Sequence, residues 1–195
     1  MSSVVLTGDT SGAGTLTVPA VAGTFTATLG SATGTHYPFT AGTAVASTSG
    51  TSIDFTSIPS WVKRITVLFS SISTNGTNAY QVQLGSGSFT TSGYTSQGTT
   101  VTGGGIGALT STTGLLVGAG VGAAAIHRGS MTIQNITGNT WVGSAIGSGL
   151  DGSGNIASRQ GGGDIALGGT LDRVRITTVG STDTFDAGTV NIFYE

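Results

Sequence analysis

Short runs in which large apolar residues occupy every second position recur along most of the chain, separated by glycine-containing turns. Such a two-residue period places apolar side chains on one face of a β-strand. The strongest run covers 61–74; Asn75-Gly76 follows it, and a second run covers 80–84. Because Asn-Gly favours two-residue hairpin turns, a tight β-hairpin is predicted here. The alternating apolar residues are Ile65, Val67 and Phe69 in the first run, and Tyr80, Val82 and Leu84 in the second.

A strand is also predicted at 53–58, ending at Pro59, because proline has no backbone donor for a sheet. The same alternation predicts further strands at 130–137, 140–146, 165–167, 172–179 and 189–194, with Gly138-Asn139 as a second hairpin turn. Segment 102–125 is too rich in glycine to assign and is either a long loop or a glycine-lined strand. No segment shows sustained helical periodicity, so helix is expected to be minor.

The chain changes in texture near residue 50. Residues 1–50 hold one charged residue, Asp9, and their apolar residues form brief alternating clusters. Strands this short do not hold a core alone, so this arm is expected to become ordered against another subunit or partner. Residues 51–195 carry the longer strand patterns. The sequence therefore predicts an all-β protein, with an N-terminal docking or oligomerisation arm (1–50) followed by an antiparallel, jelly-roll-like β-sandwich (51–195).

Charge is sparse throughout: charged residues make up 7% of the chain and the net charge is −2. An ordinary soluble domain has about 25% charged residues, and a chain this neutral tends to associate with itself. We therefore expect an obligate assembly. Six scattered basic residues do not form the basic face that nucleic-acid binding needs. No apolar run of 18 residues and no signal-peptide pattern occurs, so neither membrane insertion nor signal-directed secretion is expected.

Residues suited to catalysis or metal binding are few. The chain has no cysteine, and neither His36 nor His127 has a metal-ligand partner at close spacing, so each is interpreted as a partly exposed or interface histidine. Asp183 and Asp186 are more typical of backbone capping than of a pair of catalytic carboxylates. The loop 151–155 resembles a calcium loop only in part, because it lacks further acidic ligands and the closing glutamate.

Two glycine runs, 103–105 and 161–163, are candidates for phosphate binding. Neither is followed by the lysine and the helix-opening Ser or Thr that such a loop requires. Loop flexibility or close backbone packing is the preferred interpretation. The sequence therefore predicts no enzyme activity, no cofactor and no metal.

Large aromatic residues are the remaining candidates for ligand contact. Trp61 and Tyr80 lie in strong strand patterns, which favours core packing for them. Tyr94 lies in a polar loop rich in glycine and serine, and Trp141 opens a strand after a turn. Exposed aromatic rings often stack on sugars. Tyr94 and Trp141 are therefore the candidate ligand-binding residues, with a saccharide as the candidate ligand.

Three segments carry a resemblance to a known class of proteins. Residues 4–24, VVLTGDTSGAGTLTVPAVAGT, and the later step Ala32-Thr-Gly-Thr35 resemble a short unit in tail-fibre proteins of tailed bacteriophages. Residues 51–69, TSIDFTSIPSWVKRITVLF, look like the start of a module in many phage structural proteins. The segments 171–178, LDRVRITT, and 183–195, DTFDAGTVNIFYE, look like the end of that module.

This resemblance implies an appendage on the outer surface of a virion, generally homotrimeric. It implies that the arm docks to other virion proteins, while the C-terminal module faces outward and contacts a host-surface glycan or protein. The chain is much shorter than a typical fibre and lacks a long shaft. That departure leaves room for a short fibre, a fibre tip or a head-decorating protein. A tail fibre or appendage protein is the first hypothesis, and a capsid decoration protein is the alternative. An enzyme such as a polysaccharide depolymerase is the third class.

Overall fold

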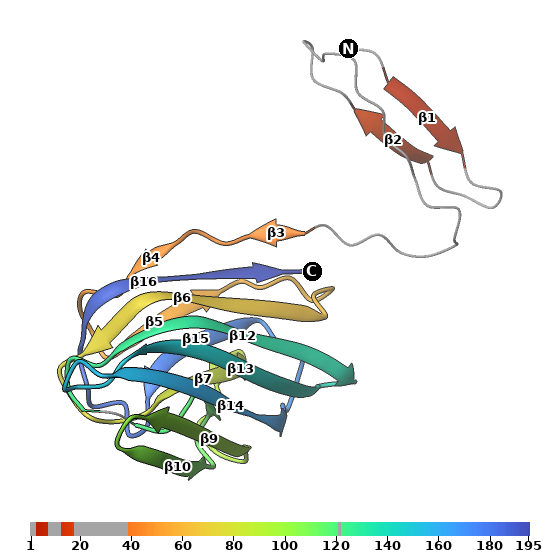
Figure 1. The fold of residues 1–195 in the computed structure, drawn as a ribbon. Helices are drawn as coiled ribbons and strands as arrows, with labels where there is room; N and C mark the ends of the chain where they lie inside the picture. Colours follow the sequence, from red (N-terminus) through yellow and green to blue (C-terminus); the bar gives the residue numbers. More distant parts are fainter. Residues whose placement is uncertain (1–2, 8–12, 18–38, 121) are drawn as a thin grey trace. The chain divides into compact units, whose positions relative to one another are not determined.

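The computed structural model describes residues 3–7, 13–17, 39–120 and 122–195. Every regular element in these residues is a β-strand, and every strand pair is antiparallel (Figure 1). The chain divides into two units, 1–36 and 37–195, which are described separately below. The predicted all-β fold is confirmed.

In the first unit, β1 (Ser3–Thr7) pairs with β2 (Ala13–Thr17), with Val5 opposite Thr15. These are two of the short strands that the alternating clusters of the arm predict. His36 and the rest of the predicted arm between 18 and 38 lie outside the described residues.

The second unit contains two sheets. The larger has the order β10-β9-β14-β13-β12-β6-β16-β3, and β4 also pairs with β16. The smaller has the order β11-β7-β15-β5, and β8 also pairs with β7. The bounds in the larger sheet are β3 (Thr40–Ala41), β4 (Val45–Ala46), β6 (Arg64–Thr74), β9 (Thr95–Thr102), β10 (Gly105–Ser111), β12 (Ile126–Thr137), β13 (Thr140–Leu150), β14 (Ile156–Ala166) and β16 (Phe185–Tyr194). Those in the smaller sheet are β5 (Ser52–Thr56), β7 (Tyr80–Ser86), β8 (Ser88–Phe89), β11 (Leu115–Leu116) and β15 (Arg173–Thr178).

The core lies between the two sheets, as the alternation predicts. Ile65 and Val67 of β6 are fully buried, and so are Val82 of β7 and Ile176 of β15 in the other sheet. Strand β5 ends before Pro59, where a strand end is expected. As in a jelly roll, the chain passes repeatedly from one sheet to the other, for example from β5 to β6 to β7. The predicted antiparallel β-sandwich is confirmed.

The predicted hairpin at Asn75-Gly76 is wrong, although both of its strands exist. Strand β6 pairs with β12 and β16, whereas β7 pairs with β15, β11 and β8. The Asn-Gly pair therefore carries the chain between sheets. Neither Asn75 nor Gly76 has the positive φ that a type I′ hairpin turn needs. Instead, Asn75 N donates to Thr184 O at 3.0 Å, and the side-chain Oδ1 of Asn75 accepts from Thr184 N at 2.9 Å.

The second predicted hairpin is confirmed. Strands β12 and β13 pair from Ile126 to Leu150, and Thr137 and Thr140 flank the turn at Gly138-Asn139. Both strands are longer than the alternation indicates, and β14 extends the predicted strand at 165–167 back to Ile156. The extensions of β13 and β14 are rich in Gly, Ser and Ala, so they lack the large alternating residues on which the prediction depends.

The unassigned glycine-rich segment also forms strands. Strand β10 pairs with β9 through a turn at Gly103-Gly104, which places Gly105 opposite Thr102. Residues 39–50 pack with the sandwich rather than with the arm to which the sequence assigns them, because β3 and β4 pair with β16. Their surface positions need few large apolar residues, so their composition resembles that of the arm.

Candidate functional site

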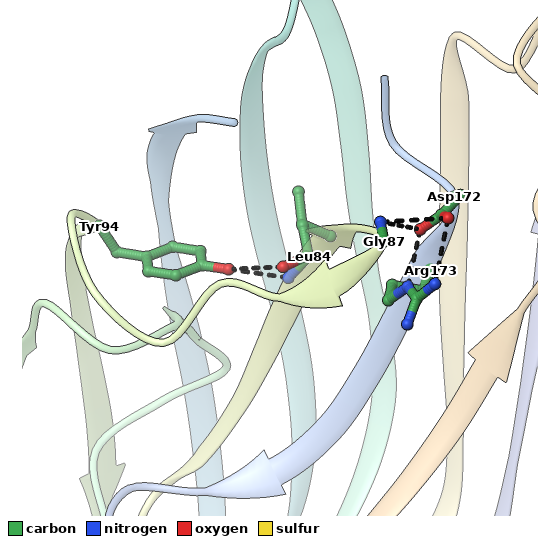
Figure 2. A network of polar contacts seen from close by, with 5 residues as sticks. All are labelled: Leu84, Gly87, Tyr94, Asp172 and Arg173. Carbon is green, nitrogen blue, oxygen red and sulfur yellow. Dashed lines mark hydrogen bonds and ion pairs between the residues drawn. The ribbon is translucent and has the colours of Figure 1, made fainter. Parts of the chain in front are cut away.

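Tyr94 is buried, not exposed as its polar neighbourhood suggests. Its side chain is 2% exposed and belongs to the core cluster. The hydroxyl accepts a hydrogen bond from Leu84 N at 2.8 Å (Figure 2). It also donates toward Thr90 O at 3.1 Å. Burial raises the pKa of Tyr94 to about 12. Its ring is therefore enclosed, and the prediction that it stacks on a ligand at the surface is corrected to a structural role.

Trp141 is buried as well, at 3% exposure, within the same core cluster. It lies between Asn135 of β12 and Ile165 of β14 in the sheet register. Its Nε1 has no hydrogen-bond partner in the described part of the chain. Strand alternation directs Trp141 inward and Val142 outward. The indole therefore fills the core and does not form a stacking platform for sugar.

His127 is also buried, so its interpretation as a partly exposed or interface residue is wrong. It is 0% exposed, because β12 begins at Ile126 and its alternation puts His127 on the same face as Met131. The imidazole lies 5.2 Å from the Phe69 ring and 6.0 Å from the Tyr80 ring, centroid to centroid. Burial, with the neighbouring Arg159, lowers the pKa of His127 to about 3.

Arg159 is also buried in the described part of the chain, at 1% exposure. Its guanidinium donates to Ile126 O and to Leu150 O, each at 3.0 Å, and these carbonyls close the paired ends of β12 and β13. Burial lowers the pKa of Arg159. These contacts give Arg159 a structural role, fastening three strands at one end of the sandwich.

The candidate metal and catalytic carboxylates accept hydrogen bonds from the protein itself, and for Asp186 the donor is the Ser73 hydroxyl. Asp151 accepts hydrogen bonds from Ser153 N at 2.9 Å and Asn155 N at 2.8 Å, and the Asn155 side chain contributes most to lowering the pKa of Asp151. Asp183 accepts from Asn78 N at 2.8 Å, a backbone group far away in the sequence and not one of its own turn. No group of three His, Asp or Glu residues in the described ranges could hold a metal ion.

The strongest charge cluster lies on the smaller sheet. Arg175 pairs with Asp54 through two hydrogen bonds of 2.7 Å, and its guanidinium lies 4.0 Å from the Phe89 ring centre. Arg173 binds Asp172, which also accepts from Gly87 N at the turn into β8 (Figure 2). Each guanidinium has a carboxylate partner, so this cluster fastens β5, β8 and β15 together.

The best candidate binding site is an open groove of about 1290 Å³ over β9, β10 and β14. No charged side chain lines it. Its exposed polar lining residues include Gln97, Thr99, Thr110 and Gln160. Amides and hydroxyls both donate and accept hydrogen bonds, and they do so without attracting an ion. The groove therefore suits an uncharged, hydroxyl-rich ligand. Sequence reasoning missed it because segment 102–125 could not be assigned.

No protein-family model, no curated protein and no solved structure matches the chain. Within the described ranges, no helix is long and apolar enough to cross a membrane.

Proposed function

We propose that this protein is a structural component of a tailed-phage particle, a tail-fibre or appendage protein that helps the particle attach to its host. In this proposal three chains associate through the N-terminal arm, which docks to other virion proteins. The sandwich then presents the groove over β9, β10 and β14 to an uncharged glycan on the host surface. The protein has no enzymatic role.

The observation that carries the proposal is the charge-free groove on a β-sandwich. Ligand sites are concave and combine apolar contacts with a few placed polar groups. Here Ala108, which shares a face of the sheet with Thr99, supplies apolar surface beside the amides of Gln97 and Gln160. Sugar hydroxyls can donate to the amide oxygens and accept from the amide nitrogens. An anionic polymer finds no cation in the lining, so a neutral glycan is the preferred ligand class.

The division of the chain also supports the proposal. The sandwich is a separate unit from the arm, as a module that is carried by a docking segment would be. Three of the described carboxylates are engaged in structural contacts: Asp54 with Arg175, Asp172 with Arg173, and Asp183 with Asn78. The resemblance of residues 4–24 and 51–69 to phage structural proteins supplies the virion context.

The binding test uses the full-length protein on an array of neutral and anionic bacterial polysaccharides. Wild type is expected to retain a neutral glycan, and Gln97→Ala combined with Gln160→Ala is expected to weaken binding about 10-fold or more, since each lost hydrogen bond contributes about 0.5–1.5 kcal/mol. Gln134→Ala is the matched control, because Gln134 is an exposed glutamine of the same sheet outside the groove. Equal binding by all three proteins, or preference for anionic polymers, contradicts the glycan assignment.

Location is tested separately by cryo-electron microscopy of intact particles. A few copies at the tail support the appendage assignment. Hundreds of copies at regular capsid positions replace it with the decoration alternative, and release of oligosaccharides from a polysaccharide by the purified protein replaces it with an enzyme.

A further inference from the structure

The two edges of the larger sheet differ in how they are covered. On one side β3 and β4 pair with β16, Phe39 stacks on Phe193 at 5.2 Å between ring centroids, and Arg64 forms an ion pair with Glu195. On the other side β10 pairs with β9 alone among the described strands. Antiparallel pairing with β9 uses the backbone groups on one side of β10, so alternate N–H and C=O groups point away from the sheet.

Strand β10 lacks the features that normally prevent edge strands from pairing. It is seven residues long, Gly105–Ser111, and it contains no proline and no charged residue. Six of its seven residues are exposed, from Gly105 to Thr110. Natural edges are usually blocked by lysine, proline, a bulge or a covering segment. The opposite edge of the same sheet is covered, which makes the open state of β10 specific to this side.

Exposed aliphatic side chains gather beside this edge. Ile106 is 76% exposed and lies directly opposite Val101, which is 47% exposed. On the next strand Ile156 is 80% exposed, two residues before Ser158, the partner of Val101. Diagonal neighbours at this spacing are about 7–8 Å apart, so the three side chains form one apolar patch. Ile106 is the member of this patch on the edge strand itself, and burying such a side chain contributes roughly 1.5–3 kcal/mol.

We infer that the β10 edge, with the exposed Ile106 on it, is the docking surface for β10 of a second copy of this chain. A strand that pairs antiparallel with its own copy presents the same donors and acceptors on both sides, so the backbone is self-complementary about a two-fold axis. The two copies then form one continuous larger sheet. This inference is independent of the proposed function and does not involve the arm.

Charge selects a second copy as the occupant. A two-fold axis places the same patch of the two copies face to face. Two copies of a charged patch repel each other, whereas two copies of a neutral patch do not. Residues 65–127, which include all of β7, β9, β10 and β11, contain no Lys, Arg, Asp or Glu. A partner recognised through charge finds no complement here, whereas an identical neutral strand does.

The first test exploits the absence of cysteine from the chain. Ala108 is the middle residue of β10, so a two-fold axis near its centre brings the two Ala108 side chains opposite each other. Directly opposite Cβ atoms are about 4.5–5.5 Å apart, close to disulfide geometry. Mild oxidation of full-length Ala108→Cys is expected to give a disulfide-linked dimer, while Ile136→Cys, 62% exposed on another strand, is not. Equal crosslinking of the two variants overturns the inference.

The second test measures mass in solution by analytical ultracentrifugation. Ile106→Lys places a charge on the β10 edge, at a site exposed enough to leave the fold intact. The mass of its assembly at micromolar concentration is expected to be half that of the wild-type assembly. Ile136→Lys is the matched control and is expected to leave the mass unchanged. A wild-type mass that Ile106→Lys does not alter, including a trimer held by the arm alone, contradicts β10 pairing. Glycan binding is read separately on the array, so failure of one proposal does not imply failure of the other.

Discussion

The imidazole of His127 lies against the ring of Phe69, 5.2 Å between centroids, in a core where neither imidazole nitrogen has a hydrogen-bond partner among the described residues. Burial lowers the pKa of His127 from 6.5 to about 3. The unfolded chain therefore binds a proton that the folded chain rejects between pH 6.5 and pH 3. His127 leaves stability unaffected above pH 6.5, and below it the free energy of unfolding falls by up to about 1.4 kcal/mol per pH unit.

Urea unfolding at pH 7, 6, 5 and 4 tests this acid dependence. The variant His127→Leu keeps an apolar side chain of similar size and is expected to flatten the dependence in that window. His36→Asn measures the contribution of the only other histidine. If wild type and His127→Leu lose stability in parallel on acidification, His127 does not carry the effect.

The Tyr94 hydroxyl is expected to contribute to stability rather than to ligand binding. It accepts from Leu84 N at 2.8 Å inside the core. Replacement of Tyr94 by Phe leaves that buried N–H without its partner, at a cost of about 1–3 kcal/mol in the free energy of unfolding. Urea unfolding measures the loss, and the glycan array is expected to show no change. Reduced glycan binding by a stable Tyr94→Phe protein would restore a ligand role for this ring.

Arg159 is expected to stabilise the end of the sandwich through its two hydrogen bonds to Ile126 O and Leu150 O. The variant Arg159→Met retains much of the side-chain volume but leaves two carbonyls without this donor. The free energy of unfolding is expected to fall by about 2–3 kcal/mol. Arg128→Met is the control, since Arg128 is exposed and donates only to Ser71. An unchanged or higher stability of Arg159→Met would mean that desolvation of the guanidinium outweighs its hydrogen bonds.

Local alternation in the sequence was sufficient to predict the sandwich and most of its strands, since Ile65, Val67 and Phe69 occupy one face of β6 as expected. It failed where the partner of a strand is decided far away in the chain. Asn75-Gly76 favours a hairpin locally, but Thr184 binds Asn75 and extends the pairing of β6 with β16, while β7 finds its partner in β15 of the other sheet.

The sites were harder to predict than the strands. In β13 the inward positions after Trp141 are Gly143 and Ala145, while Val142 and Ile146 face outward at 37% and 65% exposure. The apolar pattern there is the reverse of the burial, because Leu115 lies so close to β13 that it would contact a Cβ at Gly143 at 2.8 Å. The polarity of single residues does not reveal such a close approach between sheets. It does not reveal the groove formed by the glycine-rich strands either.

Gly161 is expected to be essential because of close backbone packing, the alternative that the sequence favoured over phosphate binding. A Cβ at Gly161 in β14 would lie 2.1 Å from Leu116 O and 2.8 Å from Leu116 C, in the strand of the facing sheet. Backbone atoms cannot yield as a flexible side chain can, so Gly161→Ala is expected to destabilise the protein by more than the usual 0.5–3 kcal/mol of a point mutation. Gly168→Ala is the matched control, because a Cβ there meets no atom within 4 Å and the backbone is unstrained. Thermal unfolding compares the two, and similar melting temperatures would contradict the tight contact between β11 and β14.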